Sequence, residues 1–199
     1  MKTQERRRDV DRTPPAPGNL ELVRSFLSVH DHEGDNEMSL PPSPESLREF
    51  FVERGLLASD EPADAGELRT ALRVHQAFHR MVLGGDARSG DARDALTVDE
   101  AARETGLELR FGAGASPMIE PRAGGVLGAL GRILAVAFLA QIDGSWNHLK
   151  VCGGETCSAV FFDRSKNHSG KWCSMQECGN RNKVRAWRAR KKAAGDTVD

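Results

Sequence analysis

Apolar residues in the first 144 positions recur mostly at helical spacing, returning every three or four residues. Four stretches show this period: 19–27, 43–55, 63–83 and 126–142. The stretch LELRFG (107–112) instead alternates apolar and polar residues, and PMIEP comes after it, beyond a glycine-rich turn. That alternation predicts a β-hairpin. The pattern therefore predicts a mainly helical N-terminal domain with one small hairpin.

Residues that favour helix starts stand before several of these stretches. Asn19 is a candidate N-cap, and Ser43 precedes a proline at the first helical position. Thr97 and Glu100 form a capping-box pattern, which predicts a further short helix. The polar, proline-rich residues 1–17 lack periodicity and are expected to be disordered.

A second module is predicted after Gly144. Leu149 to Val151 and AVFFD (159–163) are short strand candidates, and the polar turn RSKNHSG comes directly after the second of them. Residues 180–192 contain neither glycine nor proline and are predicted to be helical. We therefore expect an α+β protein with a domain at 18–144, a ββα-like module at 145–192 and a disordered tail at 193–199.

The charge of the chain is divided between these two parts. The formal net charge is only -1. Residues 1–145 hold 17 Lys and Arg against 24 Asp and Glu, whereas residues 146–192 hold 11 against 3. An acidic body joined to a basic end indicates an anionic partner for that end.

No secretory signal and no membrane span are expected. The N-terminus is charged and lacks an apolar h-region. The apolar stretch GGVLGALGRILAVAFLAQI contains Arg132 and is interpreted as a buried core helix. The expected compartment is a reducing cytoplasm, where thiols serve metal binding or catalysis more often than disulfides.

All four cysteines lie in the C-terminal module, in two equally spaced pairs: Cys152, Cys157, Cys173 and Cys178. Four thiolates from two turns form the tetrahedral shell that zinc prefers. The spacing therefore predicts a structural Zn²⁺ site, and metal binding is expected to supply much of the folding free energy of so small a module. Buried free cysteines, disulfides or redox use remain alternatives, and His148 or His168 is close enough to replace a thiol ligand.

The C-terminal helix candidate is strongly basic and carries no acid: Arg181, Lys183, Arg185, Arg188, Arg190, Lys191 and Lys192. Val184 and Trp187 are three positions apart and are expected to dock the helix on the zinc core. Like charges on one helix repel, and nucleic-acid phosphate is the usual compensating anion. The helix is therefore predicted to bind DNA, with a solvated basic tail as the alternative.

The chain resembles the bacterial CGNR zinc-finger proteins, in which an N-terminal ABATE domain precedes the finger. The resemblance rests on Cys178-Gly179-Asn180-Arg181, CGGETC, FFDRSKN and WCSM, with weaker similarity in GGVLGALGRIL and LELVRSF. It implies a stress-related transcription regulator, zinc held by the four cysteines, DNA contacts from the basic helix, and a sensing or regulatory N-terminal domain. Its module is expected to be treble-clef-like or zinc-ribbon-like.

This chain departs from the family at one place. Where relatives commonly have an Asn-Thr pair followed by an aspartate, this chain has Ser28-Val29-His30-Asp31. A ligand that such a pair contacts would be bound differently here or not at all. The effector, the DNA sequence and the oligomeric state stay open, and a homodimer through the N-terminal domain is a hypothesis.

Two other function classes compete with DNA binding. An RNA-binding or protein-interaction module would use exposed aromatics, and Trp172 and Trp187 are the candidates. An enzyme would use the acidic domain, where His30, Asp31, His32, Glu33 and Asp35 crowd one loop and His75 and His79 stand four apart. A solvated loop and half-buried helix residues explain these more simply, and no phosphate loop or nucleophile elbow is present. No enzymatic activity is expected.

Overall fold

The structure is a computed structural model that describes residues 13–28, 43–84, 91–112, 116–155 and 157–195. Within these residues it is a mixed α+β fold with a helical N-terminal part, as predicted. The elements run in the order α2 (Leu20–Leu27), α3 (Pro44–Glu53), α4 (Ala65–Leu83), α5 (Ala92–Thr105), β1 (Leu107–Arg110), β2 (Met118–Pro121), α6 (Gly125–Asp143), η1 (Ser145–His148), β3 (Leu149–Val151), β4 (Val160–Phe162), η2 (Met175–Gly179) and α7 (Asn180–Gly195).

Side-chain caps explain where α3, α4 and α5 begin. Ser43 accepts a hydrogen bond from the Ser46 amide at the start of α3, as its position predicted. Asp64 and Glu67 form a reciprocal capping box on α4. Asn19 is the N-cap residue of α2, as predicted, but its side chain makes no cap hydrogen bond. The capping-box prediction was wrong, because α5 begins at an Asp91 cap, which leaves Thr97 inside the helix.

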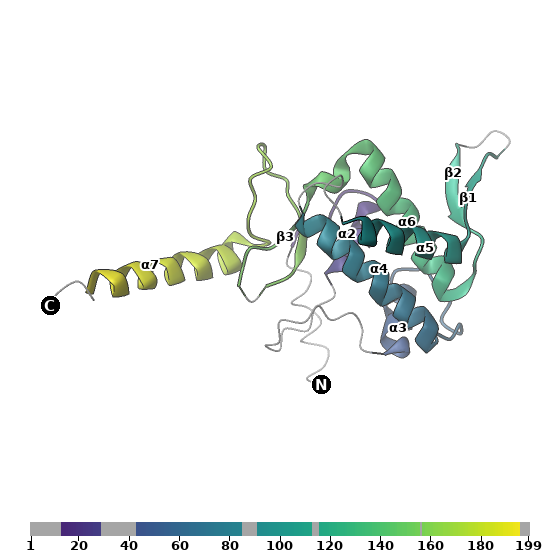
Figure 1. The fold of residues 1–199 in the computed structure, drawn as a ribbon, viewed down its shortest axis with the longest axis horizontal. Helices are drawn as coiled ribbons and strands as arrows, with labels where there is room; N and C mark the ends of the chain where they lie inside the picture. Colours follow the sequence, from purple (N-terminus) through teal and green to yellow (C-terminus); the bar gives the residue numbers. More distant parts are fainter. Residues whose placement is uncertain (1–12, 29–42, 85–90, 113–115, 156, 196–199) are drawn as a thin grey trace.

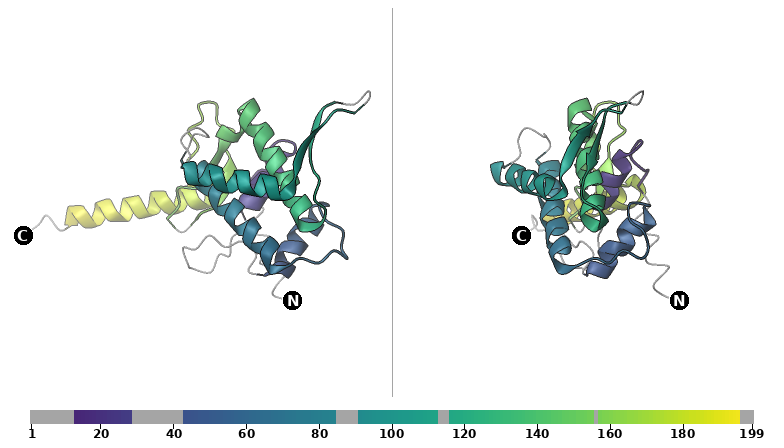
Figure 2. Two further views of the ribbon diagram at one scale, coloured as in Figure 1. Left: turned by 45° about the vertical axis from the view of Figure 1, so that its right-hand side comes forward. Right: turned by 90° about the vertical axis from the view of Figure 1, so that its right-hand side faces the viewer.

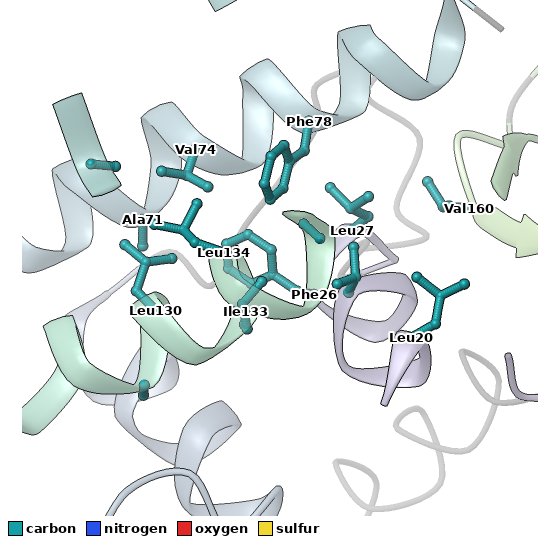
Figure 3. Close-up of a cluster of buried hydrophobic side chains, with 14 of the residues drawn as sticks. Leu20, Phe26, Leu27, Ala71, Val74, Phe78, Leu130, Ile133, Leu134 and Val160 are labelled. Carbon is teal, nitrogen blue, oxygen red and sulfur yellow. The ribbon is translucent and has the colours of Figure 1, made fainter. Parts of the chain in front are cut away.

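The core lies where α2, α4 and α6 meet (Figure 3). These helices contribute side chains that are almost completely buried: Val23, Phe26 and Leu27 from α2, Val74 and Phe78 from α4, and Leu130 and Ile133 from α6. Each helix presents one apolar stripe to the other two, and burial of these stripes fixes how the three helices pack together. The hairpin β1–β2 pairs in antiparallel register, with Leu109 opposite Ile119, and confirms the predicted hairpin.

Helix α6 is long and apolar enough to cross a membrane by length and composition alone. In the fold, 56% of its most apolar window is buried inside the protein. Gly131 lets the hairpin approach closely, since a Cβ there would lie 2.6 Å from Pro121 Cβ and 3.0 Å from Thr105 Cβ. These contacts are those of a core helix, which agrees with the interpretation made from the sequence.

The antiparallel hairpin β3–β4 uses its two faces for two different purposes. Leu149 and Val160 point into the helical core, and Val151 and Phe162 pack against it. Phe161 points to the other face, where it packs among the cysteines. Side chains alternate between faces along a strand, so one short hairpin serves both clusters.

Two polar contacts and one aromatic contact also cross the domain boundary predicted near residue 144. Ser28 Oγ, at the end of α2, donates a 2.7 Å hydrogen bond to the Val160 carbonyl. His79 Nε2, on α4, lies 3.3 Å from the Ser158 carbonyl. Trp146, in η1, packs edge-on against Phe78, with ring centroids 5.2 Å apart. Packing is thus continuous from the helical part into the hairpin.

The two ends of the described chain differ in how they pack against the rest of the protein. Residues 1–12 of the expected N-terminal tail lie outside the described residues, but Ala16 is buried and the Thr13 hydroxyl accepts a hydrogen bond from buried Arg24. At the other end, α7 continues to Gly195, beyond the predicted end near Lys192. It projects away from the body of the protein (Figures 1 and 2).

Candidate zinc centre and basic helix

Four cysteines converge between the hairpin and the start of α7. Cys152 comes directly after β3, Cys157 precedes β4, Cys173 precedes η2, and Cys178 lies near the end of η2. Their sulfur atoms all lie within 4.8 Å of one another. The Cys157–Cys173 and Cys173–Cys178 sulfur separations are 3.8 and 3.6 Å. Zinc bound to four thiolates at about 2.3 Å places neighbouring sulfur atoms about 3.8 Å apart, so the cluster fits a tetrahedral Zn²⁺.

The first cysteine turn, CGGETC, is held by backbone hydrogen bonds. The Cys157 amide donates to the Gly154 carbonyl, and the Cys152 amide donates to the Ala159 carbonyl. A side chain at Gly154 would fit only tightly, because its Cβ would lie 3.1 Å from the Cβ of Cys157 and in contact with the sulfur atoms of Cys152 and Cys178. The glycine allows the turn to pack closely against the cysteines.

The second cysteine turn is a π-helical turn that leads directly into α7. Ser174 accepts hydrogen bonds at both oxygens, from the Glu177 amide at Oγ and from the Gly179 amide at the carbonyl. The Cys173 amide donates to Cys152 Sγ at 3.4 Å, which joins the two turns. An amide that donates to a sulfur atom stabilises the thiolate form that binds zinc.

Close packing of the thiols also couples their ionisation. Hydrogen bonds from the Cys157 and Cys173 thiols lower the pKa of Cys152, because they stabilise its thiolate. The contact with Cys152 raises the pKa of Cys173, because the Cys173 thiol keeps its proton to donate to that thiolate. Four thiolates at these distances therefore require a cation among them, and a divalent metal supplies it.

Two aromatic side chains pack around the cluster. Phe161 is buried and Trp172 half-buried against the cysteines. Phe162 packs on the helical core and stacks on His148, with ring centroids 5.0 Å apart. Among the described residues, the metal-ligating group around these sulfur atoms consists of the four cysteines, without His148 or His168.

Asp163, which the sequence interpretation did not single out, organises the loop between β4 and the second cysteine turn. Its buried carboxylate accepts hydrogen bonds from Lys150 Nζ at 2.7 Å and from the amides of Ser165 and Gly170 at 2.9 and 2.8 Å. Burial alone raises the pKa of the Asp163 carboxyl, but these donors outweigh it and hold the pKa well below its usual range. The clue in the sequence was an acid placed directly after an apolar strand and before a polar turn.

The seven cationic residues of α7 lie on a helix that leaves the zinc centre and contacts little else. Asn182 Nδ2 donates to the Cys178 carbonyl, and Asn180 Nδ2 to the Gln176 carbonyl, which ties the first turn to η2. The prediction that Val184 and Trp187 face inward was wrong, since they are 47% and 55% exposed. The helix extends beyond the body of the protein (Figure 2), in agreement with this exposure.

One ion pair connects the helix with the first cysteine turn. Arg185 Nη1 lies 2.7 Å from Glu155 Oε2, and both side chains are largely exposed. Within the described part of the chain, no other cation of α7 has an ion-pair partner. The remaining positive charge faces solvent.

The structure describes only two of the residues considered for an enzyme, His75 and His79. His30, Asp31, His32, Glu33 and Asp35 lie outside the described residues. His75 and His79 are buried with rings 6.2 Å apart, and neither joins a group of three or more metal-ligating side chains among the described residues. Burial lowers the pKa of His79.

The fold and the site define a protein with a four-cysteine structural zinc centre. A model of the CGNR zinc finger family matches residues 148–191, which include all four cysteines and most of α7. No curated protein matches the chain. The prediction of a CGNR finger with structural zinc is confirmed for this region.

Proposed function

We propose that the protein is a DNA-binding transcription regulator, whose four-cysteine zinc centre positions a basic helix for contact with DNA. The observation that supports this proposal most is the charge and position of α7. The helix has seven cations and no acid from residue 180 to 192, and it projects into solvent from the four-cysteine zinc centre. Like charges at helical spacing destabilise the helix until an anion neutralises them. DNA phosphates do so and release counterions, which favours binding.

The cationic side chains have the reach and freedom that phosphate contacts require. The whole stretch from Lys183 to Lys192 is exposed. The zinc centre fixes η2, and the side-chain amide of Asn182 bonds back to Cys178, so the helix leaves the module in one direction. A positioned helix loses less conformational entropy on binding than a flexible basic tail of equal charge.

In this proposal the N-terminal part, residues 18–144, is an ABATE-like domain that senses a signal or dimerises. The protein acts in the bacterial cytoplasm, without enzymatic activity of its own. Packing across β3–β4 gives a signal in the helices a physical route to the finger, because Ser28 and His79 contact the hairpin segment directly. The effector class is left open, because Ser28-Val29 stands where relatives commonly have an Asn-Thr pair.

The test is a mobility-shift titration with duplex DNA at several salt concentrations. Wild-type affinity should fall steeply with salt, since each neutralised phosphate adds to the slope. Arg188→Glu with Lys192→Glu should abolish binding while leaving the Arg185–Glu155 pair in place. Arg93→Glu with Arg103→Glu, on exposed positions of α5, makes the same charge change away from α7 and should retain most of the affinity. Equal affinity of both double variants would refute the proposal.

The exposure of Trp187 supports a second candidate function, that of an RNA-binding or protein-interaction module. Single-stranded RNA is recognised by aromatic rings that stack on bases, and Trp187 is available for that role. Titrations with duplex DNA, single-stranded DNA and RNA under one salt condition separate the candidates. Preference for RNA, or no nucleic-acid binding at all, would favour the second candidate.

A further inference from the structure

The exposed surface of α7 is not uniformly basic. On a helix with 3.6 residues per turn, Arg181, Arg185, Arg188 and Lys192 form one row, while Lys183 and Arg190 form a second row on another side. Val184 and Trp187 fall between the two rows, and Lys191 lies on the same side one turn beyond Trp187. The helix therefore presents a short apolar strip with positive charge along both edges and Lys191 at its C-terminal end, which we call the Val184–Trp187 strip.

Both apolar side chains of the strip are exposed to solvent in the described structure. Val184 is 47% and Trp187 55% exposed, and Lys191 Nζ lies 5.1 Å from the centre of the Trp187 ring. The side of α7 that turns away from the strip carries Ala186 and Ala189 and the side-chain amide of Asn182, which is already bonded to Cys178. The largest exposed apolar side chains of the helix thus lie between its cations.

We infer that the Val184–Trp187 strip faces the floor of the DNA major groove and reads thymine methyl groups, while the two basic rows contact the two phosphate backbones. This inference rests on the proposed function. A groove about 12 Å wide admits an α-helix, and its two edges are rows of phosphate, which match the charge on both sides of the strip. Among the chemical groups on the groove floor, the thymine methyl is the one that apolar side chains contact.

The same arrangement fits double-stranded RNA poorly. The major groove of an A-form duplex is deep and narrow, so a helix cannot enter it, and uracil lacks the methyl group. The 16 residues of α7 extend over about 24 Å, which suffices to cross a major groove. The ligand class is therefore duplex DNA with thymine at the contacted positions.

The test begins with selection of bound fragments from a random duplex DNA pool, using the full chain loaded with zinc. Each thymine of the selected site is then replaced singly by deoxyuridine, which removes one methyl group and keeps the base pair. Loss of one buried methyl contact should weaken binding by about fourfold. At the remaining thymines, the replacement should have no effect.

Trp187→Ala and Val184→Ala should each reduce the thymine-to-uracil discrimination towards onefold. Both should retain the salt slope, because the cations are unchanged. Ala189→Ser, which lies outside the strip, is the matched control and should keep the discrimination. Zinc content and helical circular dichroism must equal those of the wild type, which the exposure of both side chains leads us to expect.

The outcomes distinguish the proposed function from the role of the strip. If the wild-type chain binds no DNA, the proposed function fails and the inference fails with it. If it binds DNA but deoxyuridine substitution changes nothing, or Trp187→Ala keeps the full discrimination, the inference alone is overturned. A strip that serves a protein partner instead would give this second result.

Discussion

Removal of zinc should disorder the finger beyond β4 and helix α7, and should leave the helical core folded. The thiol cluster has only Phe161 and Trp172 as large apolar neighbours among the described residues. The main core reaches into the hairpin through Leu149 and Val160, and these side chains do not depend on the sulfur atoms. The two clusters should therefore respond separately to a chelator.

The magnitudes support this separation. Ordering residues 164–179 costs about 1–2 kcal/mol per residue in backbone entropy. Burial of two aromatic side chains returns only about 1.5–3 kcal/mol each, so this segment needs the roughly 10–16 kcal/mol that structural zinc provides. Helix α7, at 16 residues with seven cations, is marginal without a fixed first turn.

Far-UV circular dichroism during chelator titration measures the loss. Helix α7 contributes 16 helical residues, whereas α2 to α6 contribute 8, 10, 19, 14 and 19, so about a fifth of the helical signal should disappear. Cys173→Ser should show the same deficit from the start. In a Trp172→Phe, Trp187→Phe background, fluorescence from Trp146 should stay that of a buried indole, since this side chain is 2% exposed. Loss of half the helical signal, or exposure of Trp146, would refute the reasoning, as would an unchanged spectrum after complete zinc release.

Three further predictions concern single substitutions. Asp163→Asn should cost about 2 kcal/mol in urea unfolding near neutral pH. Because the pKa of Asp163 is lowered in the folded protein, its contribution to the free energy of unfolding is present above the unfolded pKa near 4 and is lost as the pH falls. The stabilities of wild type and variant should therefore converge in acid, and a constant difference in stability would contradict this. Gly131→Ala should lower Tm, since overpacking against Pro121 of about 1–3 kcal/mol exceeds a helix-propensity gain of about 1 kcal/mol; a higher Tm would contradict it. Glu155→Gln should raise DNA affinity several-fold by freeing Arg185, with zinc content unchanged, and equal affinity would show that the ion pair does not compete with DNA.

The features that could be predicted from the sequence are those that short-range chemistry determines. Two cysteine pairs of equal spacing indicate a four-thiolate shell, whatever the surrounding fold. Ser43, followed by proline, predicts the start of α3 because the cap bonds an amide three residues away. The Asp91 cap of α5 was missed because Thr97 and Glu100 form an equally good local pattern. In the structure the Thr97 hydroxyl donates to the Arg93 carbonyl inside the helix instead.

The orientation of α7 could not be predicted, because it depends on what lies beside the helix rather than on the helix itself. Val184 and Trp187 have the spacing of a buried face, and the same spacing suits an exposed strip. Whether the face is buried or exposed depends on the direction in which α7 leaves η2. That direction depends on the sulfur cluster and on the Asn182 contact, which the sequence pattern does not show. The Asp163 loop was missed for a similar reason, since its donors come from both sides of the turn.

The alternation of faces in β3–β4 links the two parts of the protein. Val160 packs in the helical core and its carbonyl accepts the Ser28 hydrogen bond, while the next residue, Phe161, packs on the cysteines. A displacement of α2 or α4 that shifts this strand must therefore shift one wall of the zinc centre as well. Because Cys178 stands just before α7, such a shift would change the direction of the basic helix. In the proposed function, a signal received by the helical part would reach the surface proposed to bind DNA through these direct contacts.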